Sequence, residues 1–118
     1  KAKDGGNAQP GAKTEQPLIG PIFPLDNFIV NLSDQGGKRY LRITMALELS
    51  DVKIADVLTQ RLPQVRDAIL MILPAKKVDE MQSVEGKNAL RTELMAKLNE
   101  MTGGGTIKTI YFTEFVIQ

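Results

Sequence analysis

Apolar and polar residues alternate most clearly over residues 39–50. The residues on one face are all apolar, and they are Leu41, Ile43, Met45, Leu47 and Leu49. Successive side chains of a strand point to opposite faces, so this pattern predicts a strand with one buried face and one polar face. Residues 23–32 predict a preceding strand. The Asp and Gly residues between them, at 33–37, favour a turn, so we expect an antiparallel hairpin.

The apolar period changes from strand-like to helical after Asp51. The helical stripe comprises Ile54, Leu58, Leu62, Val65, Ile69, Ile72 and Leu73, with Asp51 or Ser50 as N-cap. Pro63 interrupts this stripe without changing its phase, which predicts a kinked helix or two abutting helices that end at Pro74. After a short turn at residues 79–81, Ser83 is expected to cap a second helix. Its apolar stripe is Leu90, Leu94, Leu98 and Met101.

Residues 107–118 are rich in β-branched and aromatic side chains and predict a final strand. At a period of two, one face carries no charge, and it comprises Ile107, Thr109, Tyr111, Thr113, Phe115 and Ile117. The other face is part charged and part apolar, and it comprises Lys108, Ile110, Phe112, Glu114, Val116 and Gln118. We expect the uncharged face in the core and the other face to be covered by another molecule. The apolar members of that second face form a candidate self-association surface of Ile110, Phe112 and Val116.

The predicted order of elements is β-β-α-α-β. It makes an α+β domain of two layers, with a small antiparallel sheet and two main helices. Two helices cover one face of such a sheet and leave the other face to solvent. Three strands also leave two edges whose backbone groups are unpaired. Self-association would cover both the face and an edge, so we expect a homo-oligomer.

The N-terminal residues differ in composition from the rest of the chain. Residues 1–16 contain no bulky apolar side chain, so they cannot bury enough surface to offset the entropy of ordering. We expect residues 1–21 to be a flexible tether and residues 22–118 to be a single domain. No apolar run approaches the roughly 20 residues of a membrane span. Because the chain begins at Lys1 rather than Met, we expect a processed or cut fragment whose membrane anchor lay upstream.

Composition excludes several classes of function. The 15 basic and 14 acidic residues are well mixed and give a net charge of +1, which argues against a nucleic-acid-binding surface. Cys and His are absent, so the usual zinc and transition-metal sites and the Ser-His or Cys-His catalytic pairs cannot be built. We therefore expect no catalytic residue, no cofactor and no metal. A hydrolase of unknown type stays open only if two carboxyl groups converge in a cleft.

Several local features invite a chemical interpretation but favour a structural one. Residues 103–105 are all Gly; they follow a helix and lack the Lys of a phosphate-binding loop, so they predict a helix stop. Gly86 indicates close packing at the start of the second helix. Arg66 either meets a neighbouring subunit or lies on a solvated face, and the second interpretation is favoured. Helix-end charge is the favoured role of Asp79, Glu80, Glu85 and Glu93.

Five segments, taken in order, resemble the flagellar basal-body-associated FliL family. They are PLDNFIVNL at 24–32, RYLR at 39–42, PQVRDAIL at 63–70, EGK at 85–87 and YFTEFVIQ at 111–118. Each segment alone is weak, whereas their order, their spacing and the FVIQ end of the chain are specific together. The resemblance covers about residues 22–118.

The resemblance implies a single-pass protein of the bacterial inner membrane, with residues 22–118 in the periplasm and residues 1–21 leaving the membrane. It implies a fold like that of the stomatin/prohibitin core domain, a non-enzymatic role and a homo-oligomeric ring. The implied partners are flagellar stator subunits of the MotA/MotB type, and the implied function is support of torque generation under load. The alternative is a generic stomatin-like envelope scaffold or adaptor that is not tied to the flagellum.

Overall fold

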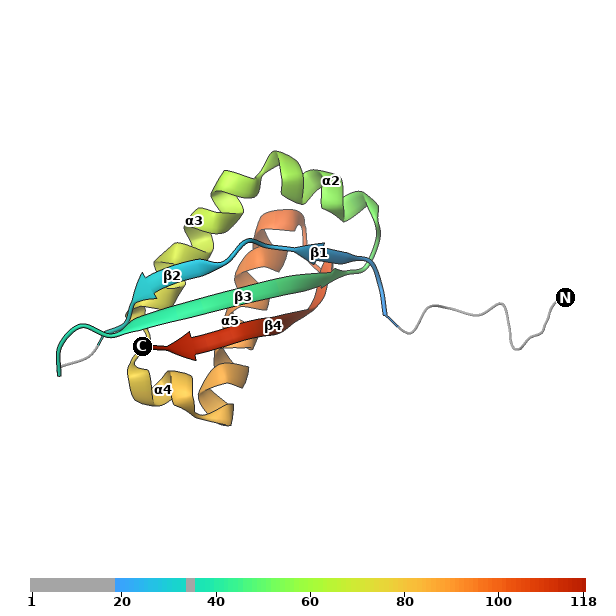
Figure 1. The fold of residues 1–118 in the computed structure, drawn as a ribbon. Helices are drawn as coiled ribbons and strands as arrows, with labels where there is room; N and C mark the ends of the chain where they lie inside the picture. Colours follow the sequence, from blue (N-terminus) through green and yellow to red (C-terminus); the bar gives the residue numbers. More distant parts are fainter. Residues whose placement is uncertain (1–18, 34–35) are drawn as a thin grey trace, which may run out of the picture.

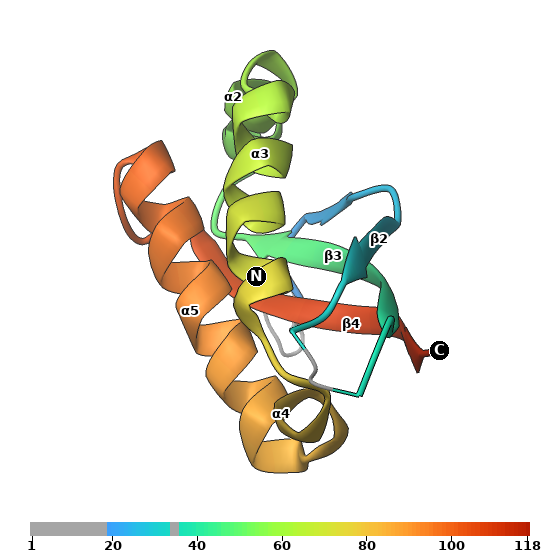
Figure 2. The same ribbon diagram turned by 90° about the vertical axis from the view of Figure 1, so that its left-hand side faces the viewer.

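The computed structural model describes residues 19–33 and 36–118, which form a sheet with helices packed against one of its faces (Figures 1 and 2). The strands are β1 (Ile22–Pro24), β2 (Phe28–Asn31), β3 (Tyr40–Leu49) and β4 (Ile107–Ile117). The helices are α2 (Lys53–Gln60), α3 (Leu62–Ile72), the 3₁₀ turn η1 (Leu73–Ala75), α4 (Val78–Gln82) and α5 (Val84–Thr102). The predicted α+β class is confirmed. The tether predicted for residues 1–21 lies, up to residue 18, outside the described residues.

The long strand β3 is the centre of the sheet. It pairs antiparallel with β4 on one side and with both β1 and β2 on the other. The predicted hairpin is confirmed, since Phe28 lies opposite Ile43 and Asn31 lies opposite Tyr40. The first strand is split, however, into β1 and β2. Three residues, 25–27, lie opposite only two, 44–45, so an extra residue interrupts the ladder there.

The core lies between the sheet and the helices, where the predicted apolar stripes meet. All five alternating apolar residues of β3 are buried, and so are Leu58, Val65, Ile69, Leu73, Leu90, Leu94 and Leu98 of the helical layer. Ile54, Leu62, Ile72 and Met101 are partly buried against this cluster. The apolar residues whose spacing predicted these helices therefore also pack the helices against the sheet.

The chain breaks between α2 and α3, as the interrupted stripe predicts. Arg61 leaves helical geometry, with φ of −110° and ψ of 20°, and Pro63 lies in the first turn of α3. A proline is tolerated there because its missing N–H would have no intrahelical partner. The prediction of two abutting helices is therefore confirmed. The turn predicted at residues 79–81 is instead the short helix α4, whose five residues are too few to show a helical period.

Both ends of α5 have the predicted caps. The Ser83 hydroxyl accepts a hydrogen bond from the Gly86 amide at 2.9 Å. A Cβ on Gly86 would lie 1.8 Å from the carbonyl oxygen of Glu80, so the close approach of α4 requires glycine at this position. At the other end, Gly103 has a left-handed φ of 99° and stops the helix.

The predicted faces of β4 are wrong in the middle of the strand. Two β-bulges interrupt its pairing with β3, and the unopposed residues are Lys108 and Thr113. Each extra residue shifts the alternation by one position and so exchanges the two faces. Ile110 and Phe112 consequently face the core, whereas Tyr111 faces solvent. Beyond the second bulge the predicted phase returns, with Phe115 and Ile117 against the core and Val116 exposed.

Candidate interaction surfaces

The three residues of the predicted self-association surface do not share a face. Ile110 is fully buried, and Phe112 is partly buried with its ring packed edge to face on Phe115 at 5.5 Å. Arg91 and Lys87, from α5, lie over these two rings at 5.1 and 4.8 Å from the centroids. Val116 alone is accessible, at 38% exposure.

The sheet face opposite the helices carries exposed apolar side chains from all four strands. We call it the open face, and its accessible large apolar residues are Ile22, Ile29, Tyr40, Tyr111 and Val116. The strand register aligns them in rows, since Ile29 and Val116 flank Arg42, and Tyr111 lies opposite Ala46. Apart from Val116, sequence patterning did not single out these residues. The sequence could have indicated Ile29, because it alternates with Phe28 and Val30, and the side chains of those two residues lie in the core.

Polar side chains in the middle of the open face are already paired. The Thr44 hydroxyl donates to a Glu114 carboxylate oxygen at 3.0 Å, and the Arg42 guanidinium lies 3.8 Å from the other oxygen of that carboxylate. The open face is thus an apolar rim around a locally neutralised centre. Such a face can bury apolar area against a partner without leaving an unpaired charge.

The edge formed by β1 and β2 is covered at its break by Arg66. The guanidinium donates to the carbonyl oxygens of Asp26 and Asn27, at 3.4 and 3.2 Å, and lies 4.2 Å from the centre of the Phe28 ring. The expectation of a merely solvated Arg66 is therefore wrong. Its side chain fastens α3 to the interruption in the sheet, where carbonyl groups have lost their ladder partners.

The edge formed by β4 is covered only in its first half. Asn99 bonds both the amide and the carbonyl of Ile107, at 2.8 and 3.2 Å, and Arg91 donates to the carbonyl of Ile110 at 2.9 Å. From Phe112 to Ile117, within the described chain, α5 supplies no comparable hydrogen bond to the outer side of the strand. This half of the edge adjoins the open face at Val116. An open edge beside an apolar face is suited to contact with another chain.

A groove lies on the helical side of the molecule, between α3 and α5, which diverge in Figure 2. Its volume is about 1070 Å³, and its lining includes Ala68, Ile72, Ala96 and Met101 with acidic residues Asp67, Glu93 and Glu100. Met71, at 73% exposure, stands at its side. The lining of the groove is therefore mixed, with apolar side chains beside charged ones.

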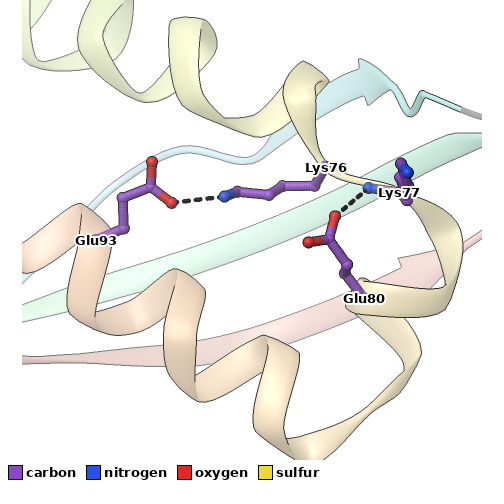
Figure 3. Close-up of polar contacts among 4 residues, drawn as sticks. All are labelled: Lys76, Lys77, Glu80 and Glu93. Atoms are coloured by element: carbon purple, nitrogen blue, oxygen red, sulfur yellow. Dashed lines mark hydrogen bonds and ion pairs between the residues drawn. The ribbon is translucent and has the colours of Figure 1, made fainter.

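Two of the four carboxylates predicted to serve helix ends, Glu80 and Glu93, have structural partners, although Glu93 lies within α5 and not at its end. Figure 3 shows Lys76, which follows η1, with its ammonium group 2.6 Å from a Glu93 carboxylate oxygen on α5. In the same view the Glu80 carboxylate accepts from the Lys77 amide at 2.8 Å and caps α4. The contact between Lys76 and Glu93 holds the η1–α4 connection against α5. No cluster of three or more acidic residues that could hold a metal ion is found within residues 19–33 and 36–118.

Glu48 is the one acidic side chain that is buried among the described residues, at 6% exposure. Its two oxygens accept from the Gly20 amide at 2.9 Å and from the Tyr111 hydroxyl at 2.5 Å. The Gly20 amide lowers the pKa of the Glu48 carboxyl below its usual value; the Tyr111 hydroxyl and the Lys108 charge act in the same direction, and burial opposes them. The same contact with Glu48 raises the pKa of Tyr111. Sequence patterning placed Glu48 only on the polar face of its strand.

Comparison with known proteins identifies the family. The family model described as "Flagellar basal body-associated protein FliL" matches residues 22–118. The chain belongs to this family. The resemblance of the five sequence segments is thereby confirmed, over the same residues.

Similar curated FliL proteins come from several bacteria. The chain is 36% identical over 107 residues to "Flagellar protein FliL" of Aquifex aeolicus, a match that covers 90% of this chain and 66% of that protein. It is 30% identical over 106 residues to "Flagellar protein FliL" of Bacillus subtilis, covering 90% of this chain and 74% of that protein. The "Flagellar FliL protein" of Caulobacter vibrioides is 26% identical over 98 residues, covering 82% of this chain. The chain spans only 48% of the length of that protein.

The part of this FliL-family chain that the structure describes contains no helix long and apolar enough to cross a membrane. The longest helix, α5, has 19 residues and carries charged side chains along its length. Helix α5 instead contributes Leu90, Leu94 and Leu98 to the core.

Proposed function

We propose that this chain is the periplasmic domain of a single-pass inner-membrane protein of the flagellar basal body, which assembles into a homo-oligomeric ring and binds the stator to support torque under load. The observation that carries the proposal is the match to the FliL family over residues 22–118. In this proposal residues 1–21 form the tether from the membrane, and the domain has a stomatin/prohibitin-like arrangement. Its role is binding rather than catalysis.

The open face and the adjoining half of the β4 edge are the proposed self-association surface. Of the three residues singled out in the sequence, Val116 is accessible there, Phe112 contributes through the outer side of its backbone, and Ile110 acts only as core support. Ile29 and Tyr111 extend the surface across the sheet, at 60% and 40% exposure. Confining the tethered domains to one membrane plane raises their effective concentration, so weak contacts between isolated domains are sufficient.

We expect Val116→Glu to reduce self-association because it introduces an unpaired charge into an apolar contact. The matched control is Val84→Glu, which makes the same change on the exposed N-terminal turn of α5, on the helical side. The full-length protein, crosslinked in native membranes and sized on gels, gives the readout. Oligomers that persist in Val116→Glu, or that are lost equally in Val84→Glu, would contradict this choice of surface.

Binding to the stator has a separate test. Full-length protein purified from membranes should bring down stator subunits, and an unrelated single-pass periplasmic protein should not. If self-association is intact and no stator subunit is recovered under crosslinking, the generic envelope scaffold becomes the better hypothesis. The two experiments therefore separate assembly of the protein from its choice of partner.

A further inference from the structure

Glu48 is a buried charge on a face that is otherwise open to solvent. A carboxylate taken out of water is stable only when hydrogen-bond donors or cations replace the water. Here the donors come from both sides of β3. Gly20 precedes β1, whereas Tyr111 and Lys108 belong to β4. The side chain thus joins the segment that leads into the domain to the last strand of the domain.

The segment at Gly20 is held closely against the end of β3. The Leu49 amide donates to the Pro21 carbonyl at 2.8 Å, and Ile22 then lies opposite Glu48 in the ladder. A Cβ on Gly20 would lie 2.4 Å from the Leu49 carbonyl oxygen, so only glycine allows this approach. With the backbone this close, the Gly20 amide points at the carboxylate and donates to it at 2.9 Å.

The β-bulge at Lys108 contributes to the same arrangement. Because Lys108 is the unopposed residue between Ile107 and Thr109, its side chain turns toward the open face, and its ammonium group lies 3.8 Å from the Glu48 carboxylate. Bulges commonly re-aim a side chain in this way. The cation and the short bond from Tyr111 together hold the carboxylate where Gly20 meets it.

We propose that Glu48, with Gly20, Tyr111 and Lys108, is a clamp that fixes the place and direction in which the N-terminal part of the chain leaves the domain. The clamp lies beside the open face, so it also fixes the direction of the chain at residues 19–21 relative to that face. Only the consequence for membrane anchoring rests on the proposed function. If the preceding segment leads to the inner membrane, every copy is attached to it from the same side of its open face.

The test measures the spread of positions of Ile19 relative to the domain. The chain contains no Cys, so Ile19→Cys and Glu100→Cys provide two unique sites for spin labels, both exposed and both outside the clamp. Pulsed electron-spin distance measurements on the 118-residue chain should give a narrow distribution. Glu48→Ala removes the acceptor of Gly20 and Tyr111, and we expect the distribution to become about twice as broad. Hydrogen exchange at the Gly20 and Leu49 amides should accelerate in parallel.

Glu114→Ala is the matched control, because Glu114 is a carboxylate on the same face that bonds Thr44 and not Gly20. It should leave the distribution unchanged. Should Glu48→Ala fail to fold, Glu48→Gln and Tyr111→Phe test the same clamp with smaller changes, and each should still broaden the distribution. Three results would overturn the proposal. They are a broad distance distribution in the labelled protein with the clamp unaltered, no change in the Glu48 and Tyr111 variants, and equal broadening in Glu114→Ala. These readouts need neither self-association nor stator binding, so they are independent of the proposed function.

Discussion

At the scale of single residues, the bonds at Glu48 have a consequence for stability against pH. The Gly20 amide, followed by Tyr111 and Lys108, lowers the pKa of this carboxyl below its ordinary value of 4.5. A lowered folded-state pKa means that the stabilisation is present above the unfolded-state value and is lost as the pH falls through the folded-state value. The clamp should therefore be intact at neutral pH and weaken only in acid below about pH 4.5.

We predict that Glu48→Gln is less stable than the wild type at neutral pH and that the difference shrinks below pH 4.5, where the wild-type carboxyl also becomes neutral. Urea unfolding at a series of pH values measures this difference. Glu114→Gln is the control carboxyl on the same face, because it has no contact with Gly20. A difference between Glu48→Gln and wild type that is constant from pH 7 down to pH 3 would contradict the assigned ionisation.

The two faces of β3 should respond unequally to truncation. Leu47 is fully buried against the helices, so Leu47→Ala should lower the free energy of unfolding by about 2–5 kcal/mol. Thr44 lies on the open face with one hydroxyl bond to Glu114, and Thr44→Ala should cost about 1 kcal/mol or less. Chemical denaturation of both variants gives the comparison. Similar losses would mean that the open face is buried in solution, as it would be inside an oligomer.

At the scale of elements, the sequence predicted strands and helices well wherever the apolar residues keep a strict period. β3 alternates without interruption and its buried face follows directly from the sequence, and the stripe through Pro63 placed both α2 and α3. β4 departs from a strict period twice, because Lys108 and Thr113 have no opposite residue in β3. Neither bulge residue is a glycine, the residue type that would have indicated a bulge in the sequence. The three-residue spacings from Ile107 to Ile110 and from Phe112 to Phe115 are the available signal of a change in phase.

The junction of α4 and α5 offers a test in which helix propensity and packing have opposite effects. Alanine is favoured over glycine by about 1 kcal/mol inside a helix, so propensity alone would make Gly86→Ala stabilising. We predict destabilisation instead, because the new Cβ would lie 1.8 Å from the Glu80 carbonyl oxygen and α4 would have to move. Thermal unfolding measures the sign. Thr92→Ala, on the exposed side of α5, should be neutral or slightly stabilising, and a stabilised Gly86→Ala would refute the packing argument.

At the scale of the whole molecule, the family and the α+β class could be predicted, but the accessible surface could not. Family resemblance depends on residues in order along the chain, which the sequence displays. The open face depends on side chains from all four strands meeting in register, including Ile29 and Val116 across Arg42. The clamp depends on a contact between Gly20 and Glu48, 28 residues apart, with Tyr111 a further 63 residues along. The period and spacing of residues along the chain do not specify such contacts, because the contacts depend on how the strands pair.

The proposed function predicts a load-dependent phenotype. A stator-binding scaffold acts by binding one state of the stator more tightly than another, and about 1.4 kcal/mol of differential affinity changes their ratio roughly tenfold. Deleting the protein should therefore leave flagella built while torque and stator occupancy fall most at high load, where engaged stators limit rotation. Bead assays across a range of loads, with fluorescently counted stators, give both quantities. Cells carrying Val116→Glu should resemble the deletion if ring assembly is required, whereas Val84→Glu cells should resemble the wild type. Torque and occupancy that match the wild type at every load in the deletion would exclude the stator role and favour the envelope scaffold.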